Sequence, residues 1–436
     1  MKVTLLNVKS KRKECINKDF MGGFGWAFNA GNSLGAKIIN FLKKRGEALP
    51  IMSFGYLAAI FASDGHEVSC ATNIIPDSDL VIMSSSMVDY GFEIDLAKHI
   101  KKKGIKLGFI GPFSGFLPEL FLDACDFIIK GEPEQAAMDI SSGGIKEGVI
   151  ESPVVKNLDS LPFPRWDIFP VKDYSYAPVL WEKPFLPVLS SRGCVNNCNY
   201  CPYVISYKYR ARSVNNVIAE IKYLKERFRI KGMIFRDPLF GLKKDFVINL
   251  CESILKEKLR LKWVCETKLD LLDKGLLDIM REAGLQVLNT GIESTNIDSL
   301  KRLGRSQLEN IKQEEIIRYC DKLGIKVTAF YMLGLPEDTV EGIENTIRYA
   351  KLLNTNVAQF FIHTPFPGTE YFNNVKKEIL EKDWHKFDCY HPVLRHKNIT
   401  NDELLKLKEL AFTSYYFRLK YILKFIWRNL RNFFTN

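Results

Sequence analysis

The chain has 436 residues, too many for one ordinary domain, and 46% of them are apolar, so two or three packed domains are expected. A formal charge of +11 is compatible with nucleic acid, anionic lipid or an acidic cofactor and selects none of them. Ten scattered cysteines exclude a regular extracellular disulfide framework and indicate a reducing cytoplasm. No secretory signal pattern is visible, and the longest apolar run, residues 51–63, is shorter than the ~20 residues of a membrane helix.

Short apolar runs alternate with helical segments from residue 1 to residue 150, as in DLVIMSSS at residues 79–86. This alternation predicts a parallel sheet with helices on both faces, as in flavodoxin-like and Rossmann-like domains. Ligands of such sheets bind beyond the carboxyl ends of the strands. The small or acidic residues predicted at those ends are Ser84, Ser85, Gly111, Gly131 and Glu132.

Residues 151–187 are rich in proline and show no sustained period, which predicts an ordered connector between two domains. A second alternation follows, with six apolar strands. They are predicted at residues 187–191, 233–235, 263–267, 287–291, 327–333 and 357–362. Six such βα units predict a partial (β/α)6 barrel over residues 188–400, followed by a C-terminal helical region at residues 401–436.

The stretch SSRGCVNNCNYCPY places Cys194, Cys198 and Cys201 directly after the first strand of the predicted barrel. Three thiolates are one short of a closed tetrahedral zinc site, so they suit a centre with one open position. The loop also follows the carboxyl end of a barrel strand, where barrel enzymes place their chemistry. A zinc knuckle, or cysteines that belong to the core, is the alternative.

This CxxxCxxC loop on a barrel of six units resembles the radical S-adenosylmethionine (SAM) superfamily. The resemblance implies a four-iron four-sulfur cluster held by the three cysteines, with SAM bound to the remaining iron. It also implies an electron donor such as flavodoxin or ferredoxin, and cleavage of SAM to a 5′-deoxyadenosyl radical.

The resemblance implies SAM contacts at five further positions. Tyr200 would lie against the adenine, Asp237 in FRDP would bind the methionine amino group, and Glu293 in GIES would accept hydrogen bonds from the ribose. Lys268 would lie near the SAM carboxylate, although it lacks the bidentate fork of arginine, and Gly334 would let the backbone approach the adenine. The alternatives are a helix N-terminal acid for Glu293 and a simple turn for Gly334.

Residues 48–135 are similar to the cobalamin-binding domain of a large radical SAM branch. The similarity implies cobalamin contacts from a set at the strand ends and on the following helix: Gly55, Tyr56, Ser84, Ser85, Gly111, Gly131 and Glu132. Gly111-Pro112-Phe113 departs from the two glycines and histidine common in relatives. His66 is predicted to be structural, which leaves the cobalt without a protein histidine. A domain that has lost its cofactor is the alternative.

The two resemblances together imply a cobalamin-dependent methyltransferase acting on an unactivated carbon of a small or lipid-like molecule. Ring formation or another rearrangement with the same cofactors is an alternative. A methylthiotransferase acting on RNA is another, with a second cluster on Cys15, Cys70 and Cys125. Apart from that alternative, nucleic acid is not an expected partner. A non-enzymatic sensor or a membrane-binding module would need a barrel without catalytic activity. The side chains predicted for a substrate pocket are Tyr203, Tyr207, His363, His385 and His391.

The last 26 residues, from Ala411, contain no acidic side chain. On a helix one face would carry Lys420, Lys424, Arg428 and Arg431. The opposite face would carry Tyr415, Leu419, Ile422, Ile426, Leu430 and Phe433. This pattern predicts either peripheral contact of a cytoplasmic protein with an anionic membrane or a helix packed on the barrel with its basic stripe in solvent.

Overall fold

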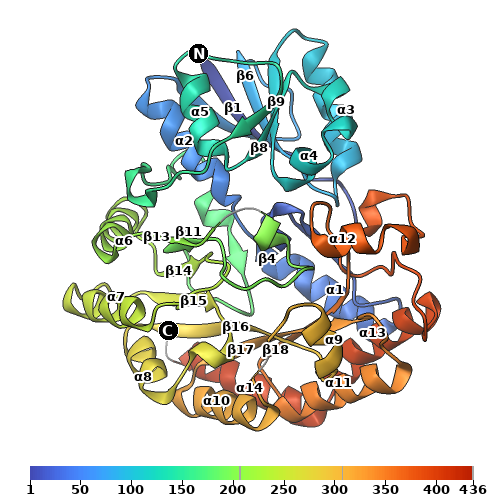
Figure 1. Ribbon diagram of the computed structural model, residues 1–436. Coiled ribbons are helices and arrows are strands. Elements are labelled where there is room, and N and C mark those ends of the chain that lie inside the picture. The colour runs from blue at the N-terminus through green and yellow to red at the C-terminus, as the bar shows by residue number, and fades with distance from the viewer. Residues whose placement is uncertain (206–207, 307, 435–436) are drawn as a thin grey trace.

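The computed structural model describes residues 1–205, 208–306 and 308–434, which form two α/β halves stacked one above the other (Figure 1). The upper half contains a parallel six-stranded sheet in the order β5-β1-β6-β7-β8-β9. Its strands are β1 (Lys2–Asn7), β5 (Glu67–Thr72), β6 (Leu80–Ser84), β7 (Lys106–Ile110), β8 (Phe127–Gly131) and β9 (Gly148–Ser152).

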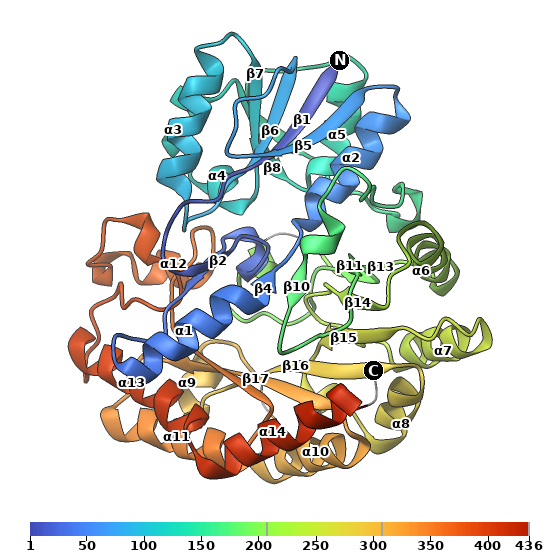
Figure 2. The same ribbon diagram turned by 180° about the vertical axis from the view of Figure 1, so that it is seen from behind.

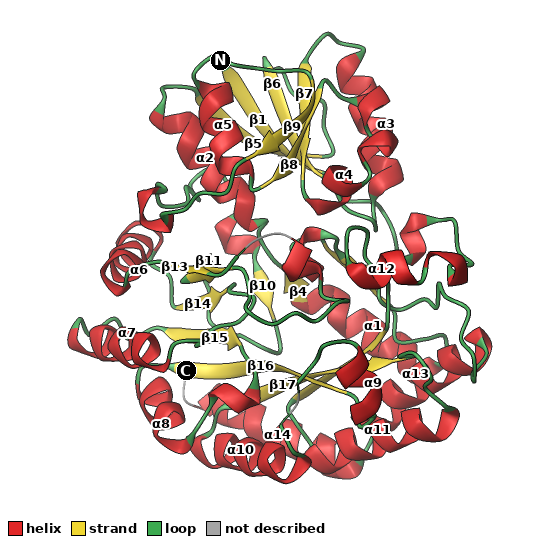
Figure 3. Cartoon of the chain, viewed as in Figure 1, coloured by secondary structure: helices red, strands yellow, loops and turns green. Residues whose placement is uncertain are grey.

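Helices cover both faces of this sheet, as the alternating pattern predicted. In Figures 1 and 3, α2 (Met52–Ser63) and α5 (Pro133–Ser141) lie on one side, and α3 (Tyr90–Lys101) and α4 (Pro112–Phe116) on the other. Central strand β6 is buried along its whole length, which is typical of a parallel strand covered on both faces. The carboxyl ends of the strands point towards the lower half.

The lower half is an open barrel built from a second parallel sheet, in the order β11-β14-β15-β16-β17-β18. Its strands are β11 (Phe185–Val188), β14 (Gly232–Phe235), β15 (Lys262–Glu266), β16 (Leu285–Glu293), β17 (Lys326–Leu333) and β18 (Val357–Ile362). The helices outside it are α6 (Val214–Phe228), α7 (Lys244–Lys256), α8 (Lys274–Glu282), α9 (Ile297–Arg302), α10 (Asn310–Leu323) and α11 (Val340–Leu353). All six predicted strands are present, with ends that differ by a few residues.

The segment between β1 and α2 does not stay with the first sheet, although residues 1–150 were expected to form one domain. It forms the hairpin of β2 (Cys15–Asn17) and β3 (Trp26–Phe28), then α1 (Leu34–Gly46) and β4 (Glu47–Ala48), and these lie beside the barrel (Figure 2). Aromatic contacts hold it there: the ring centroids of Trp26 and Phe361 are 5.3 Å apart, and those of Phe28 and Phe412 are 5.4 Å apart. Burial of these large rings stabilises the position of this segment beside the barrel.

The connector is ordered, as predicted, and its short strand β10 (Ser175–Tyr176) pairs with β4. After the barrel come α12 (Glu370–Asn374), α13 (Asn401–Tyr416) and α14 (Leu419–Phe434). Helix α13 begins with a capping box in which Thr400 and Glu403 each bond to the backbone of the other. Within the described residues, no helix has the length and apolar character needed to span a bilayer.

Candidate active site

The cysteine loop, residues 193–203, follows β11 and the short strand β12 (Ser191–Arg192) at the carboxyl end of the barrel. The loop is held from both sides through Asn199. Its backbone N–H donates to the carbonyl of Leu303 at 3.0 Å, and its carbonyl accepts from the N–H of Tyr371 at 3.0 Å. A cavity of about 190 Å³ in the barrel mouth is lined by all three cysteines of the motif, Cys194, Cys198 and Cys201.

The surroundings of these thiols fit an iron–sulfur cluster. Burial raises the pKa of Cys201 to about 12. Burial also raises the pKa of Cys198, although the positive charge of Arg305 lowers that pKa in part. Among the residues described, no three Cys, His, Asp or Glu are placed to share one single metal ion. A [4Fe-4S] cluster binds each thiolate to a different iron atom, and the three cysteines that line this cavity would supply three of its ligands. Cluster binding would displace the thiol protons.

Glu293 and Arg305 form a buried ion pair on the wall of the same cavity. The Arg305 guanidinium lies 3.0 Å from Oε1 of Glu293, and both side chains are 12% exposed. Glu293 has a φ of +64°, which few residues other than glycine adopt and which is common at functional sites. Gly291 makes room for the pair, because a Cβ at this position would lie 2.1 Å from Oε1 of Glu293.

Replacing Arg305 by alanine is expected to lower the free energy of unfolding by about 3 kcal/mol, because Glu293 would remain buried without its counter-ion. The matched control is Arg302→Ala, whose side chain is 60% exposed and pairs with the half-exposed Glu337. That variant should lose less than about 1 kcal/mol. Urea unfolding followed by tryptophan fluorescence measures both. Equal losses in the two variants would contradict a stabilising role for the buried pair.

Tyr200 and His363 also line this cavity, with ring centroids 5.4 Å apart in an edge-to-face arrangement. His363 is 3% exposed, and neither ring nitrogen has a hydrogen-bond partner among the residues that the structure describes. Burial, and then the nearby His396, lower the pKa of His363 to about 3, so the imidazole is neutral. A buried neutral imidazole can bind a ligand with one donor and one acceptor nitrogen.

Two further charged groups lie on the wall of this cavity. Lys268 is held by Ser306, whose Oγ is 2.9 Å from its Nζ, and by Asp270 at 2.8 Å. Burial raises the pKa of Glu266 to about 7, although Arg236 acts in the opposite direction. Glu266 can therefore exchange a proton near neutral pH.

Two residues predicted to contact SAM do not line the cavity. The carboxylate of Asp237 is buried and accepts hydrogen bonds from the hydroxyl groups of Ser190 and Ser191 and from the N–H of Ser190. These hydrogen bonds fix the start of the cysteine loop, and the contact of Asp237 with the methionine amino group stays a prediction. Gly334 forms a turn with a φ of +77°, and its N–H donates to Asp338 at 3.0 Å. The turn was the alternative for this glycine.

A second cavity, of about 470 Å³, lies between the carboxyl edge of the first sheet and the barrel mouth. Tyr203 and Pro238 line both cavities, so the two are adjacent. Gly111 and Gly131 have φ angles of +111° and +101° and bring bare backbone to the second cavity. This broad, glycine-lined edge fits a large flat cofactor such as a corrin. The predicted cobalamin contacts in its lining are Tyr56, Ser84, Gly111, Gly131 and Glu132.

Gly55 and Ser85, the other two predicted contacts, support the cavity from behind. A Cβ on Gly55 would lie 2.7 Å from the ring of Trp166, so this glycine is needed for packing against the connector. Ser85 is fully buried, and its hydroxyl donates to the carbonyl of Ile110 at 3.0 Å. Neither residue is among those that line the cavity.

Ion pairs join the second cavity to the cysteine loop. Arg192, directly before the loop, pairs with Glu134 at 2.7 Å and lies over the ring of Tyr56 at 4.9 Å. Glu132 pairs with Arg192 at 3.4 Å and with Arg210. These contacts fix the first sheet relative to the loop that carries the cysteines.

The histidines named in the sequence predictions lie outside the second cavity. Within the described part of the chain, the lining of the second cavity contains none. His66 is structural, because its ring nitrogens contact the N-terminal amine at 3.2 Å and the carbonyl of Ser141 at 2.9 Å. Of the predicted substrate residues, His385 bonds the carbonyl of Val88 and His391 bonds Asp388, both outside the two cavities. Tyr207 lies outside the described residues.

Sequence reasoning missed three residues of the site: Arg305, Glu266 and Lys18. Lys18 lines the second cavity and is buried, with its Nζ 2.5 Å from Glu93 and 3.5 Å from Asp89. None of the three belongs to a recognisable motif. The only signal was the isolated position of a charged residue beside apolar neighbours, as Glu266 follows the strand sequence WVC.

Comparison with known proteins gives a consistent result. The Radical SAM superfamily model matches residues 188–350. An uncharacterized methyltransferase of Pyrococcus horikoshii is 29% identical over 81% of this chain and 82% of its own length. Bacteriochlorophyllide d C-12(1)-methyltransferase of Chlorobaculum tepidum is 25% identical over 75% of this chain and 72% of its own.

The fold extends the similarity to both halves of the chain. The radical S-adenosylmethionine methyltransferase TsrM of Kitasatospora setae, solved with cobalamin and a [4Fe-4S] cluster bound, superposes with a TM-score of 0.64. The superposition covers 86% of this chain and 74% of TsrM at 14% identity. Residues 188–350 therefore match the Radical SAM superfamily, and the fold of both halves of the chain resembles that of TsrM.

Proposed function

We propose that the protein is a cobalamin-dependent radical SAM methyltransferase that acts on an unactivated carbon of a small or lipid-like molecule. The observation that carries this proposal is the pair of adjacent cavities that share Tyr203 and Pro238. One is lined by the three cysteines, the other by the glycine-rich edge of the first sheet. A substrate radical has to meet its methyl donor within a few ångströms, so adjacency is the central requirement.

The cofactors would supply the chemistry: the cluster an electron, SAM a radical and a methyl group, and cobalamin a carrier for that methyl. Each turnover would consume two SAM molecules and two electrons and would convert one substrate C–H bond to C–CH₃. The other products would be one methionine, one 5′-deoxyadenosine and one S-adenosylhomocysteine. The side chains would bind and orient. Cys194, Cys198 and Cys201 would hold the cluster, while Glu293, fixed by Arg305, would accept bonds from the SAM ribose.

The substrate would lie where the two cavities meet, near Tyr203. His363 and Glu266 offer polar contacts on the barrel side, because the ring nitrogens of His363 bond to none of the described residues and Glu266 exchanges a proton near neutral pH. The remaining wall is largely apolar and aromatic, including Phe20 and Trp26, which suits a hydrophobic substrate and limits water. An electron donor such as flavodoxin or ferredoxin is part of the proposal.

The test is a reaction of the anaerobically reconstituted protein with SAM that carries a CD₃ group, in the presence of small-molecule and lipid fractions. We expect a product that gains the CD₃ group, together with one S-adenosylhomocysteine and one 5′-deoxyadenosine per product by mass spectrometry. Formation of 5′-deoxyadenosine with a product that lacks the label would replace methyl transfer by ring formation or rearrangement.

The alternative of RNA methylthiotransfer does not fit the fold. Its second cluster would need Cys15, Cys70 and Cys125 together, but Cys70 lies on β5 and Cys125 directly before β8. Three strands, β1, β6 and β7, separate β5 from β8, which corresponds to roughly 19 Å at the usual strand spacing. Cys125 is also 3% exposed in the core.

A further inference from the structure

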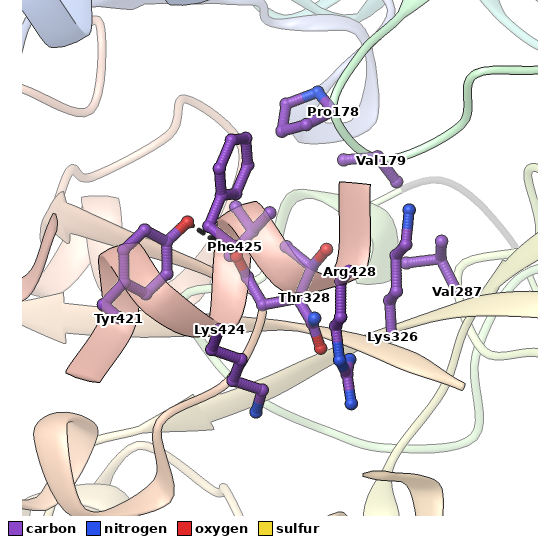
Figure 4. A pocket seen from close by; sticks show the side chains of 11 residues that line it. Pro178, Val179, Val287, Lys326, Thr328, Tyr421, Lys424, Phe425 and Arg428 are labelled. Carbon is purple, nitrogen blue, oxygen red and sulfur yellow. Dashed lines mark hydrogen bonds between the residues drawn. The ribbon is translucent and has the colours of Figure 1, made fainter. Parts of the chain in front are cut away.

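Helix α14 packs on the barrel through Tyr421 and through two of its basic residues, Lys424 and Arg428. Lys424 donates to Asp321 at 2.9 Å and to the carbonyl of Asn354 at 2.7 Å, and Arg428 donates to Asp321 at 2.8 Å. Lys424 and Arg428 line a small cavity beneath the barrel together with Lys326 (Figure 4). Asp321 and Asn354 stand at the carboxyl-terminal ends of α10 and α11, where cations are favoured by the helix dipole. The basic side of α14 is therefore bound to the protein.

The apolar side of α14 consequently faces outward, the reverse of an ordinary surface helix. Five exposed apolar residues follow the helical period of three and four: Leu419, Ile422, Leu423, Ile426 and Trp427. Phe425, which is 40% exposed, lies instead beside Lys424 and Arg428 at the small cavity. Leu419 is 72% exposed and Trp427 is 60% exposed. The prediction of a basic stripe in solvent is wrong at Lys424 and Arg428, because Asp321, distant in the sequence, binds both.

Helix α1 presents a second apolar stripe of the same kind. Its exposed residues are Leu34, Ile38, Phe41 and Leu42. The N-terminus of α1 is fixed to α13, since Glu409 accepts hydrogen bonds from the N–H groups of Asn32 and Ser33 at 2.8 and 3.0 Å. Phe417, between α13 and α14, is half-exposed and lies against Gly35. It continues the apolar surface from α1 towards α14, and both helices lie on the near side of the molecule in Figure 2.

Charge distinguishes between the partners that could cover this surface. Neither α1 nor α14 contains an acidic residue, and exposed cations flank the apolar stripes at Lys37, Lys44, Arg45 and Lys420. A second copy of the chain would bring these cations against identical ones, which is unfavourable. Anionic lipid headgroups complement them, while Leu, Phe and Trp side chains insert at the boundary of the acyl chains.

We propose that the exposed apolar face of α1 and α14 docks on the surface of an anionic lipid bilayer. The helices would lie in the plane of the membrane, with the body of the barrel above them. The two stripes would contribute together, because Glu409 and Phe417 hold α1 beside the start of α14. This inference does not depend on the reaction that the enzyme catalyses.

Co-sedimentation with phosphatidylglycerol–phosphatidylcholine vesicles tests the proposal. The reconstituted wild-type protein should bind these vesicles, bind pure phosphatidylcholine vesicles much less, and dissociate as salt rises. Phe41→Ser/Leu42→Ser and Leu423→Ser/Trp427→Ser should each weaken binding at least about tenfold, since each removes two membrane-inserting side chains. Both variants should keep their iron content and their SAM cleavage.

The matched control is Ile74→Ser/Ile311→Ser, which removes two apolar side chains, 60% and 79% exposed, that lie outside α1 and α14. It should bind vesicles like the wild type. Deletion of residues 411–436 is unsuitable, because it would remove the buried Phe412 and Tyr415 from the core. Unchanged binding by both face variants, or equal binding to neutral and anionic vesicles, would overturn the proposal. The proposal would also be overturned if the protein bound no vesicles and instead formed a dimer that the Leu423→Ser/Trp427→Ser variant dissociates.

Discussion

Alanine at Cys194, Cys198 or Cys201 is expected to abolish both cluster binding and SAM cleavage. Each thiol lines the same cavity, and the loop at residues 193–203 contains no other cysteine; Cys389, which also lines the cavity, is buried in the segment between α12 and α13. Iron content should fall from about four atoms per chain to a small residue. Production of 5′-deoxyadenosine should become undetectable. Iron and sulfide analysis after anaerobic reconstitution, followed by chromatography of SAM products, measures both effects.

The matched control is Cys70→Ser. Cys70 is a half-buried thiol on edge strand β5, remote from the barrel mouth. This variant should retain its iron and its SAM cleavage, because it removes a thiol without touching the cavity. Near-normal iron in all three motif variants would refute the assignment of the cluster to this loop.

Cobalamin is expected to bind at one molecule per chain, without a histidine from the protein, and to be required for methylation. Its site would be the second cavity, so filling that cavity should prevent binding. Ser84 lies at the end of β6, is 9% exposed and lines the cavity. Ser84→Phe should therefore lose most of the cobalamin and of the methylated product, while cluster content and SAM cleavage remain measurable.

Ser142→Phe is the control, because Ser142 is exposed at the end of α5 and bonds only within its own helix, to Met138. It should bind cobalamin like the wild type by absorption spectroscopy. Electron paramagnetic resonance of the reduced cofactor reports whether a nitrogen ligand is present. Methylation by cobalamin-free protein, or a histidine nitrogen bound to cobalt, would exclude the proposed arrangement.

The parts of the fold that the sequence predicts well are those with a local signal. The strands of both sheets have short apolar runs between turns, and the cysteine spacing lies within eight residues. The hydrogen bonds of Asp237 could not be predicted, because its partners, Ser190 and Ser191, lie 47 and 46 positions away and bind both carboxylate oxygens. The orientation of α14 depends on Asp321, 103 positions from Lys424. Such pairings are decided by tertiary packing and leave no periodic trace in the chain.

The segment at residues 8–48 was missed for the same reason. Its elements are short and carry no motif, and they are held by rings from the end of the barrel and from α13. A linear division into domains by composition cannot detect an early segment that packs on the latest part of the chain.

Because the segment at residues 8–48 packs beside the barrel, the chain connects the two halves more than once. The chain passes from the first sheet to the barrel side after β1, returns before α2, and passes again after β9. Three covalent connections, reinforced by the ion pair of Arg192 with Glu134 at 2.7 Å, tether the halves at separate points. Three tethers restrict rotation of one half against the other more than a single linker would. We therefore expect access to the two cavities to depend mainly on local movement of side chains and loops at the rim, with little change in the distance between the cavities.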